Sequence, residues 1–417
     1  MTQASLSDLT RIFARIGILS FGGPAAQIAL MHRVVVDEQR WISERDYLSA
    51  LSFCMLLPGP EAMQLATWIG WKAQGWRGGL IAGGLFVLPG ALVVGALTAL
   101  YLGFGHLPGV AALFVGVQAA VIAVVVEAVL RLSRRALKGR TQLALAVLAF
   151  LGLALFALPF PVIVLGAALW GFAMGRGPAT LPPPAAPPPW GASLRALIIW
   201  GAVWLVPLGL LAWQGGFLAE IAGFFSKLAL LTFGGAYAVL AWMAQEVVEG
   251  RGWLSLRQMI DGLGLAETTP GPLILVTEFV AFVAGHGRGG WGLGLAAAIT
   301  ALWMTFAPCF LWIFAGAPWI DRLTAAPRLS AALAAITAAV VGVIAHLSLW
   351  FALHVLFGQT FRLAAGPVSL TLPDLATLQP LALALALFSG GALLWHHWPL
   401  PVVLAICALV PAALTLV

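Results

Sequence analysis

The chain has 417 residues, of which 62% are hydrophobic and only 9% are charged. A soluble domain carries roughly 25% charged residues, so this composition excludes a protein surrounded only by water and predicts an integral membrane protein. The formal net charge of +6 suits loops that meet anionic lipid head groups, and we expect the lipid bilayer, not nucleic acid, as the partner of this surface.

Apolar segments follow one another from Ile12 to Val417. About 20 apolar residues cross the roughly 30 Å of hydrocarbon as a helix, and lipid offers no partner to an open backbone. We therefore predict an all-α, polytopic membrane protein with roughly 12 to 14 spans. The first residues, with Asp8 and Arg11, lack the pattern of a cleaved secretory signal and are expected to remain in the mature protein.

The first half opens with an apolar helix that is interrupted at Phe21-Gly22-Gly23. A polar turn follows, in which Trp41 suits the membrane interface and Ser43, three residues before Asp46, predicts a helix N-cap. The next apolar helix is interrupted by Pro58-Gly59-Pro60. Proline has no amide hydrogen and clashes with the preceding turn, so this motif predicts the end of one half-helix and the start of another.

A proline-rich segment separates the halves. We predict a first repeat over residues 1–176, a semi-rigid linker over 177–192 and a second repeat over 193–417. Five basic residues crowd one loop of the first half, which places that loop on the cytoplasmic face. They are Arg131, Arg134, Arg135, Lys138 and Arg140.

The second half repeats the motifs of the first at a constant offset of 212 residues, as from Phe21 to Phe233. Phe233-Gly234-Gly235, Ser255 with Gln258, and Pro270-Gly271-Pro272 take the places of their first-half counterparts. The chain is therefore a tandem duplication. The second half lacks the basic loop, which favours an inverted repeat, whereas the register of Arg45 with Arg257 points to the same orientation.

The paired interruptions predict a binding site for an anion. A half-helix N-terminus presents unpaired N–H groups and roughly half a positive charge, so two of them at the repeat interface could hold one phosphate-like or sulfate-like ion. The alternative is a proline kink that only serves packing, and glycine pairs also allow close helix approach. The predicted site comprises Ser20, Gly22, Gly23, Pro58, Gly59, Pro60, Gln64, Thr232, Gly234, Gly235, Thr269, Pro270, Gly271 and Pro272.

Charged residues near the interruptions extend this prediction. Arg15 and Lys227 are a register pair, and each either assists the anion or extends to the head groups. A carboxylate beside an anion site would link proton uptake to anion binding. Glu61 is our first choice for this role and Glu267 our second, although Glu61 could instead complement the helix dipole. Glu278 is a further carboxylate to which the sequence assigns no role.

Other chemistry finds no support in the sequence. No zinc-protease, nucleophile-elbow or phosphate-loop motif is present, so we predict no enzyme activity and no cofactor. Cys54, Cys309 and Cys407 have no paired spacing, which argues against a metal site and favours buried thiols.

The motifs together resemble the chromate ion transporter family in its long form with two homologous halves. The resemblance rests on Phe21-Gly22-Gly23-Pro24, the segment Leu56 to Glu61, Leu88-Pro89-Gly90, Phe233-Gly234-Gly235 and Thr269 to Pro272, and it covers nearly the whole chain. It implies a carrier of the bacterial inner membrane that expels chromate, driven by the proton gradient, with sulfate as a competitor. The second half departs from the first in having Ala236 opposite Pro24 and Leu273 opposite Glu61.

We therefore expect a secondary transporter for a tetrahedral oxyanion, working as an antiporter, in a chain compatible with a homodimer. The alternatives are a transporter of sulfate or another oxyanion and an anion channel without proton coupling. A membrane enzyme acting on an oxyanion ester is a third alternative, for which the sequence shows no nucleophile.

Overall fold

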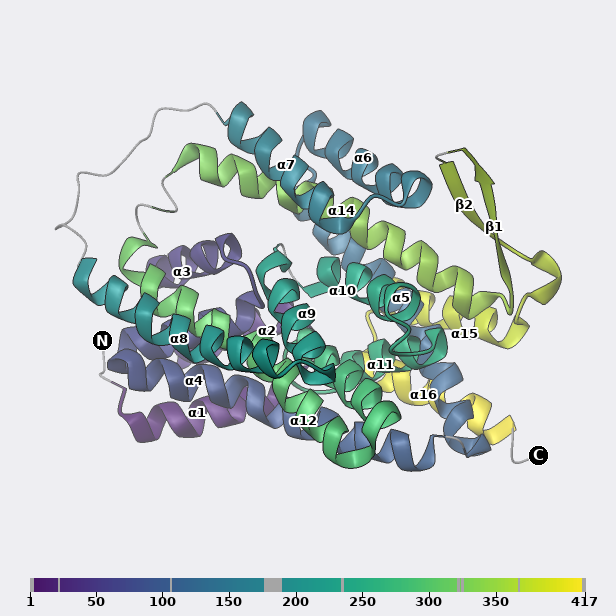
Figure 1. Cartoon of the computed structure of the whole chain (residues 1–417), viewed down its shortest axis with the longest axis horizontal. Coiled ribbons are helices and arrows are strands. Elements are labelled where there is room, and N and C mark those ends of the chain that lie inside the picture. The colour runs from purple at the N-terminus through teal and green to yellow at the C-terminus, as the bar shows by residue number, and fades with distance from the viewer. Residues whose placement is uncertain are drawn as a thin grey trace. The chain divides into compact units, whose positions relative to one another are not determined.

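The computed structural model describes residues 4–21, 23–105, 107–175, 190–233, 236–320, 323, 326–366 and 368–414. Within these ranges helices dominate, which confirms the predicted all-α class (Figure 1). The helices of the first repeat are α1 (Leu6–Leu19), α2 (Gly23–His32), α3 (Glu44–Leu56), α4 (Glu61–Phe104), α5 (Pro108–Ala136), α6 (Arg140–Phe156) and α7 (Phe160–Met174).

The second repeat follows a matching order at its start. Its helices are α8 (Trp190–Gln214), α9 (Phe217–Leu231), α10 (Ala236–Gln245), α11 (Leu256–Thr268), α12 (Val276–Gly316), α14 (Pro327–Leu356), α15 (Pro380–Gly390) and α16 (Leu400–Leu414). Both α2 and α10 continue into π-helical turns, at Arg33–Glu38 and Glu246–Gly250. Of the predicted linker, residues 177–189 lie outside the described residues, and α8 begins at Trp190.

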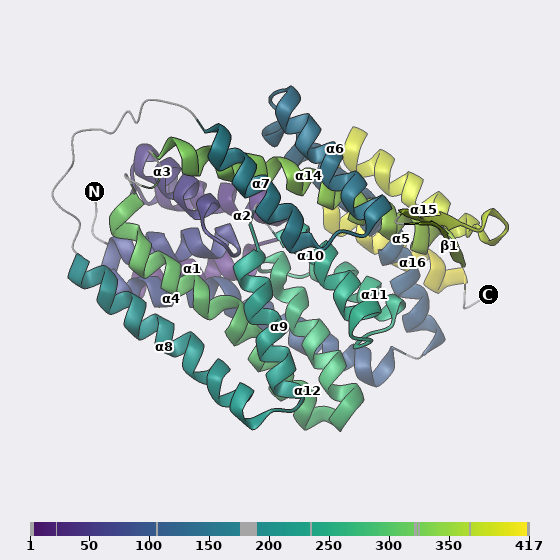
Figure 2. The same ribbon diagram turned by 45° about the horizontal axis from the view of Figure 1, so that its top comes forward.

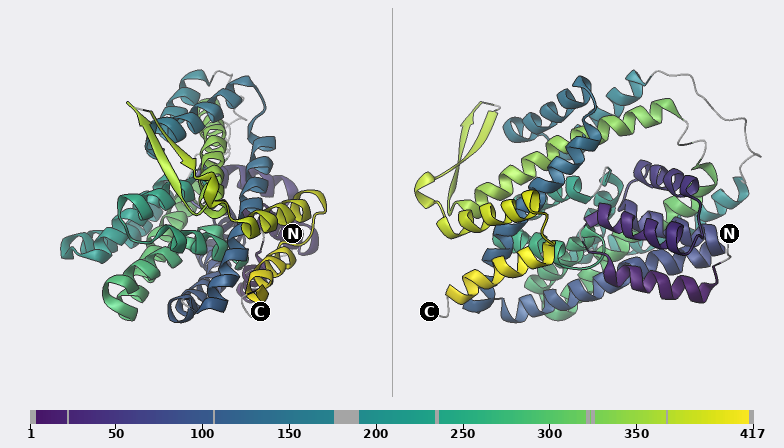
Figure 3. Two further views of the ribbon diagram at one scale, coloured as in Figure 1. Left: turned by 90° about the vertical axis from the view of Figure 1, so that its right-hand side faces the viewer. Right: turned by 180° about the vertical axis from the view of Figure 1, so that it is seen from behind.

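A β-hairpin between α14 and α15 was not predicted. Strands β1 (Thr360–Ala365) and β2 (Val368–Pro373) pair antiparallel, with Thr360 opposite Pro373 (Figure 3). The segment alternates polar and apolar side chains, as in Thr371 and Leu372, which is the periodicity of a strand with two different faces.

The chain divides into two compact units that cut across the sequence repeats. One unit combines Met1–Thr98, Met174–Val239 and Thr269–Ala331, and the second combines Ala99–Ala173, Leu240–Thr268 and Ala332–Val417. Each unit therefore draws segments from both halves of the chain.

In the first unit, α4 and α12 each contain a sharp bend, at Gln74 and Gly75 and at Gly289 and Gly290. The two arms of α4 pack together so closely that a Cβ atom on Gly70 would lie 2.1 Å from the carbonyl oxygen of Gly78. Each of these helices is thus a helical hairpin whose arms meet at small residues. Helices α8 and α9 both pack against α12 (Figure 2).

Local signals for helix starts are confirmed. Ser43 accepts a hydrogen bond from the amide of Asp46 at 3.1 Å. Ser255 and Gln258 cap each other: the Gln258 amide donates to Ser255 Oγ, and the Ser255 amide donates to Gln258 Oε1. The three cysteines are buried free thiols, as predicted.

Within the described residues, five helical runs are long and apolar enough to cross a membrane, and four shorter apolar helices accompany them. The expected 12 to 14 spans differ from this because several apolar segments form half-length helices. For example, α3 has 13 residues, or about 20 Å at 1.5 Å per residue. Helix α8 leaves large apolar side chains such as Ile198 and Trp213 exposed, which suits a lipid-facing surface.

Candidate functional site: the two Pro-Gly-Pro turns

Helices end on both sides of each Pro-Gly-Pro motif. In the first unit, α3 ends at Leu56 and α4 begins at Glu61, and the bend at Gln74 closes an arm of residues 61–73. That arm is also about 20 Å long, less than the hydrocarbon thickness of about 30 Å. The first turn, Pro58-Gly59-Pro60, therefore joins two half-length helices.

The two turns make reciprocal contacts with the opposite repeats. The amide of Gly59 donates to the carbonyl oxygen of Thr232 at 2.7 Å, and the amide of Gly271 donates to the carbonyl oxygen of Ser20 at 2.9 Å. Both acceptors lie where a broken helix, α1 or α9, has just ended. Since all four residues keep the 212-residue register, the two contacts are equivalent by the internal repeat.

These contacts correct one part of the anion-site prediction. Gly59 has the only amide hydrogen between its two prolines, and Gly271 has the only one between its own. Both hydrogens are bound to protein carbonyls. Both glycines have positive φ, 122° and 94°, which other residues rarely adopt. The glycine amides therefore connect the repeats and are not free donors for an anion.

Other donors remain at the first turn. The first N–H groups of an α-helix have no acceptor inside the helix, and the helical bonding of α4 starts with the amide of Gln64 donating to the carbonyl of Pro60. The amides of Ala62 and Met63 precede that bond, in residues that are buried. An anion at this turn would meet these amides.

Two buried glutamines hold the turns. The Gln27 amide nitrogen donates to the carbonyl oxygen of Gly271 at 2.7 Å and to that of Ser20 at 3.3 Å. The Gln64 amide nitrogen donates to the carbonyl oxygen of Pro58 at 2.7 Å. Both side chains are fully buried, and within the described residues their Oε1 atoms have no hydrogen-bond partner. Gln64 belongs to the predicted site, whereas Gln27 was missed.

Two hydroxyl residues of the predicted site, Ser20 and Thr232, are buried and bonded within their own helices. Ser20 Oγ donates to the carbonyl of Ile16, and Thr232 Oγ1 donates to the carbonyl of Leu228. Their hydroxyl hydrogens are thus used within α1 and α9, and only their lone pairs remain available. Thr269, Pro270 and Pro272 are also buried, and Gly23 begins α2; Gly22, Gly234 and Gly235 lie outside the described residues.

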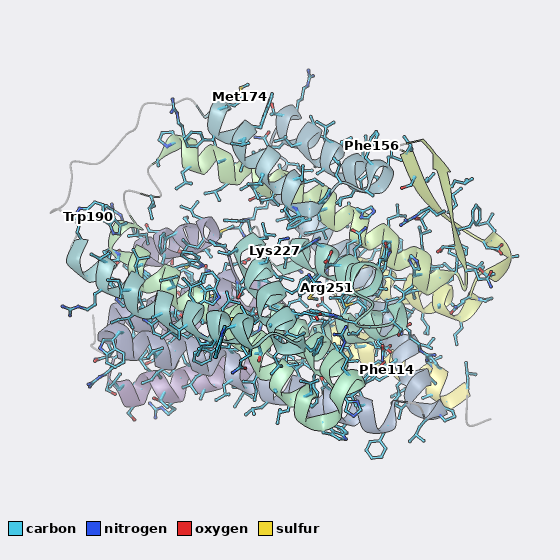
Figure 4. The ribbon with its side chains drawn as sticks, in the orientation of Figure 1. Phe114, Phe156, Met174, Trp190, Lys227 and Arg251 are labelled. Atoms are coloured by element: carbon cyan, nitrogen blue, oxygen red, sulfur yellow. The ribbon has the colours of Figure 1, made fainter. Side chains whose placement is uncertain are left out.

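The predicted basic pair, Arg15 and Lys227, lies on the exposed faces of its helices. Arg15 on α1 and Lys227 on α9, the latter labelled in Figure 4, are exposed. Phe13 and Phe225 on the same helices are fully buried. In this conformation the two charges therefore point away from the packed face of each helix.

The predicted proton-coupling carboxylates differ in burial. Glu61 is the first residue of α4 and is partly exposed, while Glu267 is buried near the end of α11. A position at the start of a helix also suits the helix dipole, so both interpretations of Glu61 remain compatible with its place.

The second unit contains a separate buried carboxylate. Asp261 on α11 accepts hydrogen bonds from the Tyr101 hydroxyl at 2.8 Å and from the Gln118 amide nitrogen at 2.5 Å. Asp261 is 2% exposed, so these donors replace water around its carboxylate. They also connect α11 to α5 and to the end of α4.

Loss of one of these donors should be measurable. We expect Tyr101→Phe to destabilise the protein by about 1–3 kcal/mol, because a buried carboxylate oxygen loses its partner. Thermal unfolding of the purified protein in detergent measures the change. An unchanged melting temperature would show that Asp261 does not depend on this hydroxyl.

The second unit also has a polar cavity of about 180 Å³. It lies between the hairpin, the end of α14, α6 and the π-helical turn after α10. Arg362 at its wall pairs with Glu249 at 3.5 Å. Within the described residues, no group of three or more histidine, cysteine, aspartate or glutamate side chains is arranged to hold a metal ion.

Taken together, the apolar helices, the duplicated broken segments and the reciprocal turns define a multi-pass membrane transporter. The sequence profile of the family described as "Chromate transporter" matches residues 7–172 and 219–412, one region in each repeat. The chain belongs to the chromate transporter family, and the predicted resemblance is confirmed.

Individual relatives agree with this assignment. The chain is 35% identical over 350 residues to the chromate transport protein of Pseudomonas aeruginosa, covering 82% of this chain and 79% of that protein. It is 31% identical to the chromate transport protein of Cupriavidus metallidurans, with 82% and 81% covered. It is also 31% identical to a probable chromate transport protein of Synechococcus elongatus, with 82% and 83% covered. No solved structure matches the chain significantly.

Proposed function

We propose that this protein exports chromate across the inner membrane of a bacterium and draws on the proton gradient to do so. Family membership and the names of the relatives support chromate as the transported ion. The structural observation that carries the proposal is the reciprocal contact of the two Pro-Gly-Pro turns with the opposite repeats.

The turns offer a way to bind and release an oxyanion. The N-terminus of α4 begins directly after the first turn and would attract negative charge through its dipole and first amides. Burial strengthens this attraction, since less water competes for the ion. Ala62 and Met63 would donate their amides, while Gln27 and Gln64 hold the backbone of the turns in position. Sulfate, with the same tetrahedral shape and charge, would compete for this site.

Alternating access would follow from the reciprocal contacts. Each turn is bound to a helix end of the other repeat, so movement of one repeat against the other must displace both turns. Broken helices at a repeat interface serve this purpose in many secondary transporters. Arg15 and Lys227 would guide the anion, and Glu61, with Glu267 as second choice, would exchange the coupled proton. The second repeat is proposed to be inverted, and the assembly is compatible with a homodimer.

Flux measurements in proteoliposomes test the function. An imposed pH gradient should drive chromate flux through the purified protein, with protons moving in the opposite direction, as in an antiporter. Sulfate should slow the chromate flux. Chromate flux of equal size with and without the gradient would instead indicate an uncoupled anion channel.

Glu61→Gln tests the proton partner. We expect this variant to keep chromate exchange when the pH is equal on both sides. Its gradient-driven chromate flux should fall at least tenfold, because the amide cannot release a proton. Glu127→Gln, at a partly exposed carboxylate paired with Arg131, is the matched control. Gradient-driven flux that stays at the wild-type rate in Glu61→Gln would assign the proton to another group.

A further inference from the structure

Glu278 is a buried acid that the predicted mechanism does not use. It lies in the first arm of α12, is 6% exposed, and its Oε2 atom has no hydrogen-bond partner within the described residues. A carboxylate ion without water or a partner is costly to bury, and ionisable groups inside membrane segments usually take part in ion pathways.

The surroundings of this carboxyl group are shaped by a glycine. A Cβ atom on Gly95 of α4 would lie 2.9 Å from Oε1 of Glu278, so any larger residue there would press on the acid. The two helices are thus in direct contact at this point, and their contact leaves the carboxyl group little room for water.

Glu278 also lies near the second turn. A Cβ atom on Gly90, five residues before Gly95 on α4, would lie 2.4 Å from the carbonyl oxygen of Pro270. Five residues of α-helix rise about 7.5 Å, which places the acid roughly one and a half helical turns beyond Pro270-Gly271-Pro272. A change at the acid can therefore reach the turn through a single rigid helix.

The acid is present in one repeat only. Its register equivalent in the first half is Ala66, which is fully buried. The fold of the repeat therefore does not require a carboxylate at this position. The presence of the acid in one repeat only suits a role in coupling proton movement to anion transport.

Other charged side chains near α12 are less deeply buried than Glu278. Those on the described helices that pack against α12 are exposed or partly exposed. They are Glu61, Lys72 and Arg77 on α4, Arg195 on α8, and Glu220 and Lys227 on α9.

We propose that Glu278 is a proton-binding site of this transporter, neutral while α4 and α12 are in contact at Gly95 and ionised when they separate. This inference rests on the proposed chromate transport. The proton passes from the carboxyl group to a water molecule, leaving a carboxylate and a hydronium ion. The carboxylate favours the separated, hydrated arrangement, in which α4 no longer holds Gly90 against the second turn. Proton loss and rearrangement of the turn therefore favour each other.

The test compares two kinds of flux in proteoliposomes that contain the full chain. Chromate exchange at equal pH reports the anion pathway, and chromate flux driven by a pH gradient, followed with a pH-sensitive dye, reports coupling. Glu278→Gln should retain exchange within threefold of the wild type and lose gradient-driven flux and proton movement by at least tenfold. Glu220→Gln, a half-exposed carboxylate on α9 that pairs with Arg288 at 3.6 Å, should retain both.

Several results would overturn the inference. Gradient-driven flux at the wild-type rate in Glu278→Gln removes the proton role, and so does a folded variant that has lost exchange, because a neutral amide should imitate the protonated acid. If Glu278→Gln does not fold, Glu278→Asp decides: proton coupling with a shifted pH profile supports the inference, and an unchanged profile contradicts it. A wild-type protein that moves no chromate under any condition would refute the proposed function itself, a result distinct from all of these.

Discussion

Gly90→Ala is expected to abolish chromate transport and to destabilise the protein by about 1–3 kcal/mol, the usual cost of inserting a methyl group into a packed interior. The added Cβ atom would lie 2.4 Å from the carbonyl oxygen of Pro270 and 3.0 Å from the Cα atom of Gly271. Both are backbone atoms, so the second turn must move away from α4. That movement would weaken the bond of the Gly271 amide to Ser20.

Gly84→Ala on the same helix is the matched control. Apart from the neighbouring backbone of its own helix, no atom of the described residues lies within 4 Å of a Cβ atom built on Gly84. Alanine also favours a helix over glycine by about 1 kcal/mol, so this variant should be as stable as the wild type or more so. Thermal unfolding and chromate flux measure both variants. Equal flux in Gly90→Ala and Gly84→Ala would show that the close contact at Gly90 is not required for transport.

Gln27→Leu is expected to destabilise the protein by about 1–3 kcal/mol and to reduce chromate flux at least tenfold. The substitution keeps a similar volume but removes the amide that joins the carbonyl oxygens of Gly271 and Ser20, which then lose a buried donor. Loss of the unpartnered Oε1 atom offsets part of this cost. Flux should fall more than stability suggests, because the turn loses its fixed position.

Gln214→Leu, at the exposed end of α8, controls for the loss of a glutamine as such. It should change stability by less than about 0.5 kcal/mol, as most surface substitutions do. A Gln27→Leu protein with wild-type flux and melting temperature would mean that the second turn is held by its other contacts alone.

Local chemistry in the sequence accounts for the helices and for where several of them start. The caps at Ser43 and Ser255 depend on partners three residues away, so a short pattern is enough to predict them. The same local reasoning predicted unpaired N–H groups near the Pro-Gly-Pro break that contains Gly59. The acceptor of the Gly59 amide is the carbonyl of Thr232, in the opposite repeat, and no local pattern contains that information.

The partner of Gln27 also could not be predicted from the local sequence. Gln27 is one polar residue in an apolar segment, and its acceptor at Gly271 is 244 residues away. A buried glutamine among apolar neighbours indicates that some partner is needed, but it does not indicate which one. The hairpin was missed for a different reason: residues 357–373 were considered only as a loop with few basic residues, although polar and apolar residues alternate there.

The exchange of contacts between the repeats also has a consequence for biogenesis. When the first half of the chain leaves the ribosome, the carbonyl group of Thr232 that will accept from Gly59, and the turn that Gln27 will hold, have not yet been synthesised. The early helices therefore enter the bilayer before their partners in the later half exist, and water or an insertion factor must accommodate these polar groups until translation reaches that half. Long-range closure of this kind is slow, which makes the partly inserted chain the stage most exposed to quality control.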